Sequence, residues 1–324
     1  RFKPDVVTVW NTGGLWKSML FKLSERTMPK IYCLSDYSLL QELRKDQWVA
    51  FWTRRASGAS RETVKWLARQ CFRLAGIHVP DPNTRLPLNQ AFFTSQALRN
   101  EYAQASIQPA TSRVIYWGIQ VERFAAIEGS QYDPGRLLFA GNVRREKGVH
   151  TAIEALHLLD QRGHGHFTLD IVGGSMALDY LRQIRRRVED LRLSDRVKFL
   201  GPVPHDSMPD IYRGYGILLF PSIWKEPFAL TILEAMASGL AVVSTARGGS
   251  AEILRDGQNA LVFTAEDHQD LADNVQLLWN DRELYDRVRL AGRQLVQSQY
   301  TLVQMVDRIE DFIEQTIRRS LSEG

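Results

Sequence analysis

The sequence predicts an α/β protein made of two Rossmann-like, doubly wound domains, each with a parallel sheet. Short apolar runs, which are typical of buried strands, alternate along the whole chain with segments of helical periodicity. That alternation indicates βαβ units and therefore parallel sheets. The length of 324 residues exceeds what one compact domain usually contains, which favours two domains over one.

The composition is that of a globular protein with sizeable cores, because 44% of the residues are hydrophobic and 24% are charged. No apolar run approaches the roughly 20 residues that a membrane-spanning helix needs. We therefore expect a cytoplasmic protein that is at most peripheral to the inner face of a membrane. The formal net charge of +4 fits an anionic ligand or a membrane surface, and it fits simple solubility equally well.

The two cysteines, Cys33 and Cys71, both lie in apolar patterns, which predicts buried free thiols in a reducing compartment. In the first half of the chain, strands are predicted at residues 6–10, 30–34, 91–94 and 113–116, and helices at 14–26, 61–74 and 95–102. One face of the 61–74 helix carries Val64, Leu67, Cys71 and Leu74. Ser95 is placed to cap the start of the following helix.

Residues 47–55 combine aromatic side chains with Arg54 and Arg55. Such a stretch can touch a membrane surface or line the cleft of a second substrate. The helical spacing of Trp48, Trp52 and Arg55 favours another interpretation, a helix that faces the core and has a charged end.

The second half of the chain follows a poorly periodic stretch, residues 126–135, which we interpret as an interdomain linker. It separates a first domain of residues 1–125 from a second domain of residues 136–300, and a last helix falls within 301–324. Strands are predicted at residues 136–140, 167–172, 196–200, 217–220 and 240–243, and helices after Gly148 and at 178–191, 229–238, 267–278, 282–297 and 301–317.

The segment 215–249 holds the strongest functional signal. It predicts a strand, a loop with Glu226, a helix with Glu234 two turns inside, and a second strand. Loops at the carboxyl ends of parallel strands are where open α/β sheets bind ligands. The start of the helix offers the free N–H groups of Phe228, Ala229 and Leu230, which suit a phosphate. This combination fits a nucleotide sugar, which has sugar hydroxyls, a diphosphate and ribose hydroxyls.

The residues from Glu226 to Gly239, E-P-F-A-L-T-I-L-E-A-M-A-S-G, resemble the E-x7-E segment of retaining GT-B glycosyltransferases of the GT4 family (glycosyl transferase group 1). The resemblance is close over residues 136–317 and looser over 1–125. It implies a GT-B fold whose N-terminal domain lacks its first strands, with the last helix packing back toward that domain. It also implies the transfer of a hexose-type sugar from a nucleotide sugar, UDP- or GDP-linked, to a glycan or a lipid-linked acceptor, without a cofactor.

The resemblance assigns roles to several residues. Glu234 would bind the ribose hydroxyls, and Glu226 would hold the donor sugar and favour the positive charge that develops on its ring. Lys147 matches the lysine of the family's G-R-x4-K-G loop, which grips the diphosphate. The arginine of that loop falls on Asn142, so Arg144 or Arg145 would have to supply its charge.

Other donor contacts that the resemblance implies come from backbone. Gly141 and Gly173 end two strands and allow close approach to the ligand. Val203 would lie beside the nucleobase. Ser35 stands where the family has a histidine that faces the transferred sugar. Serine can still donate a hydrogen bond there, but a polar strand end is the favoured interpretation.

Several other chemistries are not indicated. The sequence has no HExxH, CxxC or DxD spacing, so no metal site is expected. It has neither a G-x-S-x-G elbow nor a G-x-G-x-x-G turn. The arginines in residues 182–187 fit a solvated helix face, so we expect no nucleic acid partner. Two other functions remain open: a nucleotide-sugar epimerase or hydrolase on the same scaffold, and a non-catalytic module that binds nucleotide sugar.

Overall fold

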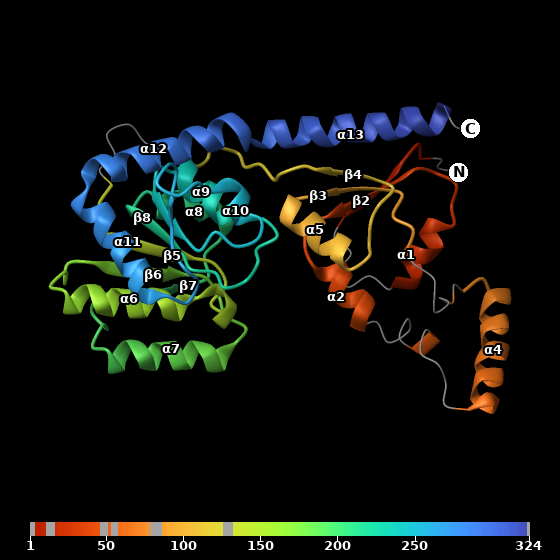
Figure 1. The fold of residues 1–324 in the computed structure, drawn as a ribbon, viewed down its shortest axis with the longest axis horizontal. Helices are drawn as coiled ribbons and strands as arrows, with labels where there is room; N and C mark the ends of the chain where they lie inside the picture. Colours follow the sequence, from red (N-terminus) through yellow and green to blue (C-terminus); the bar gives the residue numbers. More distant parts are fainter. Residues whose placement is uncertain are drawn as a thin grey trace. The chain divides into compact units, whose positions relative to one another are not determined.

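The chain divides into two compact units in a computed structural model (Figure 1). The structure describes residues 4–10, 17–45, 51–52, 58–77, 79, 86–125 and 132–322. Unit 1 comprises Arg1–Tyr116 with Asp307–Gly324, and unit 2 comprises Trp117–Val306. The division thus falls between Tyr116 and Trp117, earlier than the linker predicted at 126–135, of which residues 126–131 lie outside the described residues.

Unit 1 contains a four-stranded parallel sheet in the order β1-β2-β3-β4. Its strands are β1 (Val7–Trp10), β2 (Lys30–Leu34), β3 (Gln90–Phe93) and β4 (Thr111–Val114). Its helices are α1 (Lys17–Ser24), α2 (Ser38–Lys45), α4 (Ala59–Leu74) and α5 (Gln96–Gln104). The predicted cap is confirmed, because Ser95 Oγ accepts a hydrogen bond from the Leu98 amide at 3.0 Å. The four strands were predicted within three residues of their observed bounds.

The last helix, α13 (Leu302–Ser322), belongs to unit 1 from Asp307 onward. Phe312 is buried and lies edge-on to Phe92 of β3, with ring centroids 6.3 Å apart. Arg113 of β4 forms an ion pair with Asp311 at 2.7 Å. This part of the helix therefore completes the core of unit 1.

The prediction of a helix at α4 is confirmed, but the prediction that Cys71 is buried is wrong. The helix forms, but it buries none of its residues, and Val64, Leu67 and Leu74 are 66%, 52% and 90% exposed. Cys71 is exposed, because it lies on the same face. Cys33, in the middle of the unit 1 sheet, is buried as predicted, and burial raises the pKa of its thiol to about 12.

Unit 2 contains a six-stranded parallel sheet in the order β10-β9-β8-β5-β6-β7. Its strands are β5 (Arg136–Ala140), β6 (Thr168–Val172), β7 (Val197–Gly201), β8 (Ile217–Phe220), β9 (Ala241–Ser244) and β10 (Leu261–Val262). Its α-helices are α6 (Val149–Gln161), α7 (Leu178–Asp190), α8 (Met208–Tyr212), α9 (Leu230–Ala237), α10 (Ser250–Ile253), α11 (His268–Asn280) and α12 (Arg282–Gln299). Two 3₁₀ turns, η1 (Arg145–Lys147) and η2 (His205–Ser207), complete it.

The strand order of unit 2 fixes where a ligand can bind. From β5 the chain winds to β6 and β7 on one side, and it then returns to β8, β9 and β10 on the other. Because the order reverses between β5 and β8, the loops at their carboxyl ends diverge and open a crevice. Figure 1 shows α6 and α7 on one face of this sheet and α9 and α12 on the other. Unit 2 is therefore doubly wound, as predicted.

Short elements escaped prediction. The two-residue β10 and the helices α8 and α10 are too short to show a period. In α7 only Ile184 and Val188 are buried, and Leu178 at its start is 60% exposed. None of the helices that the structure describes is long and apolar enough to cross a bilayer.

Candidate functional site

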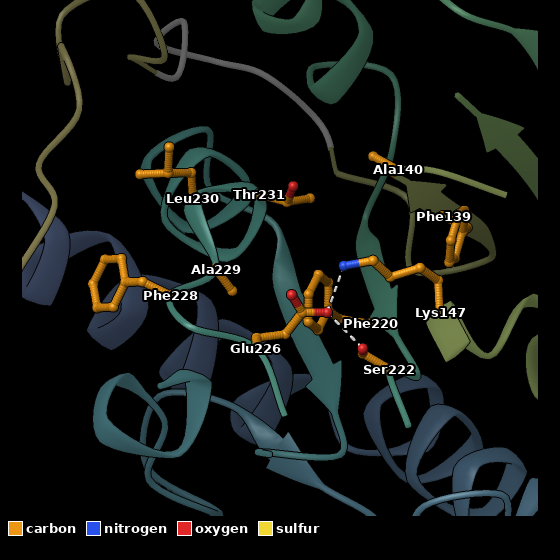
Figure 2. Close-up of a pocket in the computed structure, with 11 residues that line it drawn as sticks. Phe139, Ala140, Lys147, Phe220, Ser222, Glu226, Phe228, Ala229, Leu230 and Thr231 are labelled. Carbon is orange, nitrogen blue, oxygen red and sulfur yellow. Dashed lines mark hydrogen bonds and ion pairs between the residues drawn. The ribbon is translucent and has the colours of Figure 1, made fainter. Parts of the chain in front are cut away.

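A cavity of about 240 Å³ opens at the carboxyl ends of β5 and β8, where the strand order reverses (Figure 2). It is lined by Phe139, Ala140, Gly141, Lys147, Phe220, Ser222, Glu226, Phe228, Ala229, Leu230 and Thr231. Six of these residues were predicted from the sequence as donor-site residues: Gly141, Lys147, Glu226, Phe228, Ala229 and Leu230. They come from the loop after β5 and from the loop and helix after β8, so the topology brings the two predicted segments together.

The loop after β5 carries Lys147 at the end of η1. Gly148 follows with φ of +73°, and a Cβ atom there would lie 1.9 Å from the carbonyl oxygen of Pro221. Glycine therefore lets this loop press against the loop that leaves β8. The contact is reinforced by the Glu146 carbonyl, which accepts hydrogen bonds from the amides of Ile223 and Trp224 at 2.9 and 3.1 Å. Lys147 is thus held opposite Glu226.

Glu226 is 6% exposed and is held by both its backbone and its side chain. Its carbonyl accepts a hydrogen bond from the Gly249 amide at 2.6 Å, and the residue forms a parallel bridge with Gly248. Its Oε1 accepts from Lys147 Nζ and from Ser222 Oγ, each at 2.6 Å. Figure 2 shows both groups reaching the same oxygen. Two donors on one oxygen fix the carboxylate while leaving its other oxygen for a ligand.

The glycines after β5 and β6 permit a close backbone contact at the edge of the site. Gly173 has φ of +140°, and a Cβ atom at this position would lie 1.8 Å from the carbonyl oxygen of Gly141. Both glycines were predicted to allow close approach to a ligand, and the contact observed here is between their own backbones. Because the obstacle is backbone, the Gly141 loop would have to move to admit a side chain.

Gly173→Ala is therefore expected to lower the free energy of unfolding by about 3 kcal/mol or more, the sum of a strained conformation and a steric clash. Gly163→Ala is the matched control, because Gly163 also has a positive φ of +83° but a Cβ there would meet open space among the described residues. The control should lose only about 1–2 kcal/mol. Chemical denaturation measures both losses, and equal losses would contradict the proposed clash.

The start of α9 faces the cavity. The helix begins at Leu230 with Ala229 as its N-cap, and no side chain caps it. Its first N–H groups are therefore left for a ligand, with the positive end of the helix dipole behind them. The structure moves the helix start one residue later than predicted, so Thr231 joins the predicted Phe228, Ala229 and Leu230 in the lining.

Glu234 lies inside α9 and is 6% exposed. Its Oε2 accepts a hydrogen bond from Tyr212 OH at 2.9 Å, and its Oε1 lies 2.8 Å from His205 Nε2. Burial, and secondarily the Glu234 carboxylate, raise the pKa of Tyr212 well above its usual value, so the phenol stays protonated as a donor. Glu234 is thus fully engaged by side chains and lies outside the residues that line the cavity.

Arg144 and Arg145, which were proposed to supply the charge of the family's arginine, form ion pairs outside the cavity lining. Arg144 forms an ion pair with Glu146, and Arg145 lies 3.8 Å from Glu266. Their side chains are 54% and 72% exposed, and neither lines the cavity. Asn142 is exposed as well. Within the described lining of the cavity, Lys147 is the one cationic side chain.

Two other predicted residues lie apart from the cavity lining. Val203 is half-buried in the segment between β7 and η2. Ser35 belongs to unit 1, where it follows β2 and its carbonyl accepts a hydrogen bond from Thr94 Oγ1 at 3.4 Å. No group of three His, Cys, Asp or Glu side chains suited to a metal ion occurs within the described part of the chain.

Four residues that bring polar side chains to the site were not predicted: Ser222, Thr231, His205 and Tyr212. Ser222 and Thr231 could have been found, because both lie at the carboxyl end of the predicted strand or in the first turn of the predicted helix. His205 and Tyr212 left no comparable signal, because their contact with Glu234 joins segments more than 20 residues apart.

The sequence profile of the family described as Glycosyl transferases group 1 matches residues 120–295, more than half of the chain. The chain belongs to this family. The matched region contains both loops of the cavity, Glu234 and its two partners. The predicted resemblance is therefore confirmed at the level of this family.

Relatives within the family have different activities. The chain is 30% identical over 186 residues to the mannosylfructose-phosphate synthase of Agrobacterium fabrum, a match that covers 56% of this chain and 40% of that protein. It is 32% identical over 188 residues to a glycogen synthase of Mycobacterium tuberculosis, covering 58% of this chain and 44% of that protein. The matched segments thus span less than half the length of these relatives.

Solved structures show the same fold. HepE from Anabaena, in complex with UDP and glucose, superposes with a TM-score of 0.67 at 20% identity, covering 89% of this chain and 72% of that one. Sucrose-phosphate synthase from Thermosynechococcus elongatus superposes with a TM-score of 0.72 at 18% identity, covering 97% and 74%. The chain therefore has the GT-B fold of two Rossmann-like domains, as predicted.

Proposed function

We propose that this protein is a retaining glycosyltransferase that moves a hexose-type sugar from a UDP- or GDP-linked donor to a glycan or lipid-linked acceptor. The observation that carries the proposal is the arrangement around the cavity. A fixed carboxylate, a lysine and an uncapped helix start converge where an open parallel sheet binds its ligand. The HepE structure, of the same fold, contains UDP and glucose, which is consistent with a nucleotide-sugar donor.

The donor would bind along α9. Its diphosphate would meet Lys147 and the first amides of the helix, which supply positive charge without a metal ion. Its sugar would contact Glu226, and its ribose would reach Glu234. Val203 would contact the nucleobase through its backbone. No resident cofactor is needed for this chemistry, because the sugar arrives already activated.

The transfer step depends on charge that is in place beforehand. As the bond from the sugar to the diphosphate lengthens, positive charge develops on the ring and negative charge on the leaving phosphate. Glu226 would stabilise the first, and Lys147 with the helix amides the second. We propose that the acceptor hydroxyl attacks from the face that the diphosphate leaves, which retains the anomeric configuration. The leaving phosphate would take the acceptor's proton.

A thermal-shift screen against UDP, GDP, ADP and their sugars tests the donor site. We expect one nucleotide family to raise the melting temperature, because a ligand that binds only the folded state stabilises it. Glu234→Ala should reduce the rise. A wild-type chain that responds to none of the nucleotides, or an equal rise in the variant, would contradict the proposed donor site.

We also propose that the protein works in the cytoplasm and touches a membrane surface, and that α4 makes the contact. The predicted aromatic stretch is a poorer candidate, because Trp52 is buried, and Trp48, Arg54 and Arg55 lie outside the described residues. Trp52 packs edge-on against Phe72 of α4, with ring centroids 5.8 Å apart, and its carbonyl accepts a hydrogen bond from Arg69.

The packing leaves the aliphatic face of α4 outside. Phe72 and Arg69 face the protein, whereas Val64, Leu67 and Leu74 lie on the other side of the helix and are more than half exposed. The helix carries four basic residues, Arg61, Lys65, Arg69 and Arg73, against one acidic residue, Glu62. An exposed aliphatic face on a basic helix fits an anionic bilayer.

Sedimentation with vesicles tests this contact. The chain should bind vesicles that contain phosphatidylglycerol more tightly than vesicles of phosphatidylcholine alone. A V64S/L67S/L74S triple variant should lose about ten-fold or more in affinity, because it removes three apolar side chains that would enter the bilayer. Leu178→Ser on α7, which removes an equally exposed leucine, is the control and should change nothing. Equal binding by the triple variant would contradict membrane contact.

A further inference from the structure

His205 and Tyr212 each contact one carboxylate oxygen of Glu234, but they differ in their exposure to solvent. Tyr212 is 0% exposed, so its hydroxyl is a permanent partner of Oε2. The His205 side chain is 62% exposed, whereas that of Glu234 is 8% exposed. Because an ionised carboxylate only accepts hydrogen bonds, His205 must donate its Nε2–H to Oε1. One partner of Glu234 is therefore fixed, and the other can be exchanged with solvent or a ligand.

The surroundings of His205 support this difference. Phe124, which is 2% exposed, lies against both rings, with centroids 6.1 Å from His205 and 6.1 Å from Tyr212. Tyr212 is the last residue of α8 and is fully buried, whereas His205 lies in the short turn η2 and its side chain is mostly exposed. A rotation of His205 about its side-chain bonds would expose Oε1 of Glu234 without disturbing the core.

We propose that His205 caps Glu234 while the site is empty, and that the ribose hydroxyls of the donor displace it. His205 then tunes the affinity for nucleotides with free ribose hydroxyls, because these hydroxyls must replace the hydrogen bond that is broken. This inference rests on the proposed function, in which Glu234 binds the ribose. A nucleotide without these hydroxyls would have to bind with the cap in place, or leave the Glu234 carboxylate without its partner.

The cap lowers the affinity for every ribonucleotide by the strength of one hydrogen bond. Removing the His205 imidazole should therefore tighten ribonucleotide binding, whereas the loss of a ligand contact would weaken it. It should leave the binding of a 2′,3′-dideoxynucleotide unchanged, because that ligand never displaces the cap. The difference between the two ligands thus isolates the exchange at Glu234 from any general effect on the site.

Isothermal titration of UDP and 2′,3′-dideoxy-UDP against His205→Ala tests the proposal. We expect UDP to bind to this variant about 2- to 10-fold more tightly than to the wild-type chain. Dideoxy-UDP should bind equally to both. His205→Gln, which keeps an N–H donor at a similar reach, should behave as the wild type. His268→Phe, a change to an exposed histidine on α11, is the control for general surface effects and should also match the wild type.

A second arm uses Glu234→Ala. In that background His205→Ala should no longer alter UDP affinity, because the capped carboxylate is gone. Weaker or unchanged binding of UDP to His205→Ala, or an equal change for both ligands, would overturn the capping role while leaving the donor site intact. A wild-type chain that binds none of UDP, GDP and ADP would overturn the donor site itself, and the capping role with it.

Discussion

Replacing Glu226 with glutamine is expected to lower turnover by about 10²–10³-fold, a size typical of losing one placed charge in an active site. Donor affinity should change far less. Glutamine keeps the shape of the side chain and can still accept the hydrogen bonds from Lys147 and Ser222 that now reach Oε1. It loses the negative charge, which matters most when the sugar ring becomes positive. Turnover of the sugar nucleotide and UDP affinity, measured on the same preparation, separate the two effects.

The control for Glu226→Gln is Glu266→Gln, which removes a carboxylate that is 53% exposed and whose nearest cationic partner in unit 2 is Arg145. It should leave turnover unchanged. If Glu226→Gln folds normally and turns over at the wild-type rate, the proposed role of Glu226 is wrong. If turnover and UDP affinity fall by the same factor, Glu226 contributes to binding rather than to the transfer step.

Replacing Lys147 with methionine is expected to weaken UDP binding by about 10- to 100-fold, the range for a hydrogen bond between charged groups. Uridine, which lacks the diphosphate, should bind equally to the variant and the wild type. The substitution also leaves the buried carboxylate of Glu226 without its cation, so we expect a loss of stability of about 3 kcal/mol. Calorimetric titration with both ligands and chemical denaturation measure these effects.

Lys147→Arg is the conservative partner of that experiment. It keeps the charge and should recover most of the affinity for UDP, although its planar group need not reproduce the geometry of the ammonium. Equal losses of UDP and uridine affinity in Lys147→Met would show that the lysine supports the cavity as a whole. The proposed contact with the diphosphate would then be wrong.

The strands of unit 2 could be predicted from the sequence because parallel strands that are covered on both faces are continuous apolar runs. β8, Ile217–Phe220, is buried at every position and was predicted with its observed bounds. The meeting of the 141–148 loop with the Glu226 loop could also be anticipated, because both follow strands and carboxyl ends of parallel strands share one edge. Both predictions depend on the order of strands and loops along the chain and not on the positions of individual side chains.

Features that depend on side-chain direction could not be predicted. Arg144 and Arg145 precede a helix in the right loop, but their nearest acidic partners, Glu146 and Glu266, draw them away from the cavity. In α4 the periodicity identified the helix and its apolar face correctly, but that face is exposed, so the predicted burial of Cys71 is wrong. A period shows that one face is apolar, but it does not show what that face meets. The cap on Glu234 belongs to the same class, because it joins a turn and a helix that no spacing relates.

The measurement that tests the donor site most directly is a crystal structure of the chain with bound UDP. We expect the diphosphate to lie within hydrogen-bond distance of Lys147 Nζ and the amides at the start of α9. We also expect the ribose hydroxyls to contact Glu234, with His205 turned away. A complex in which UDP lies elsewhere on unit 2, with the cavity between the β5 and β8 loops empty, would contradict it.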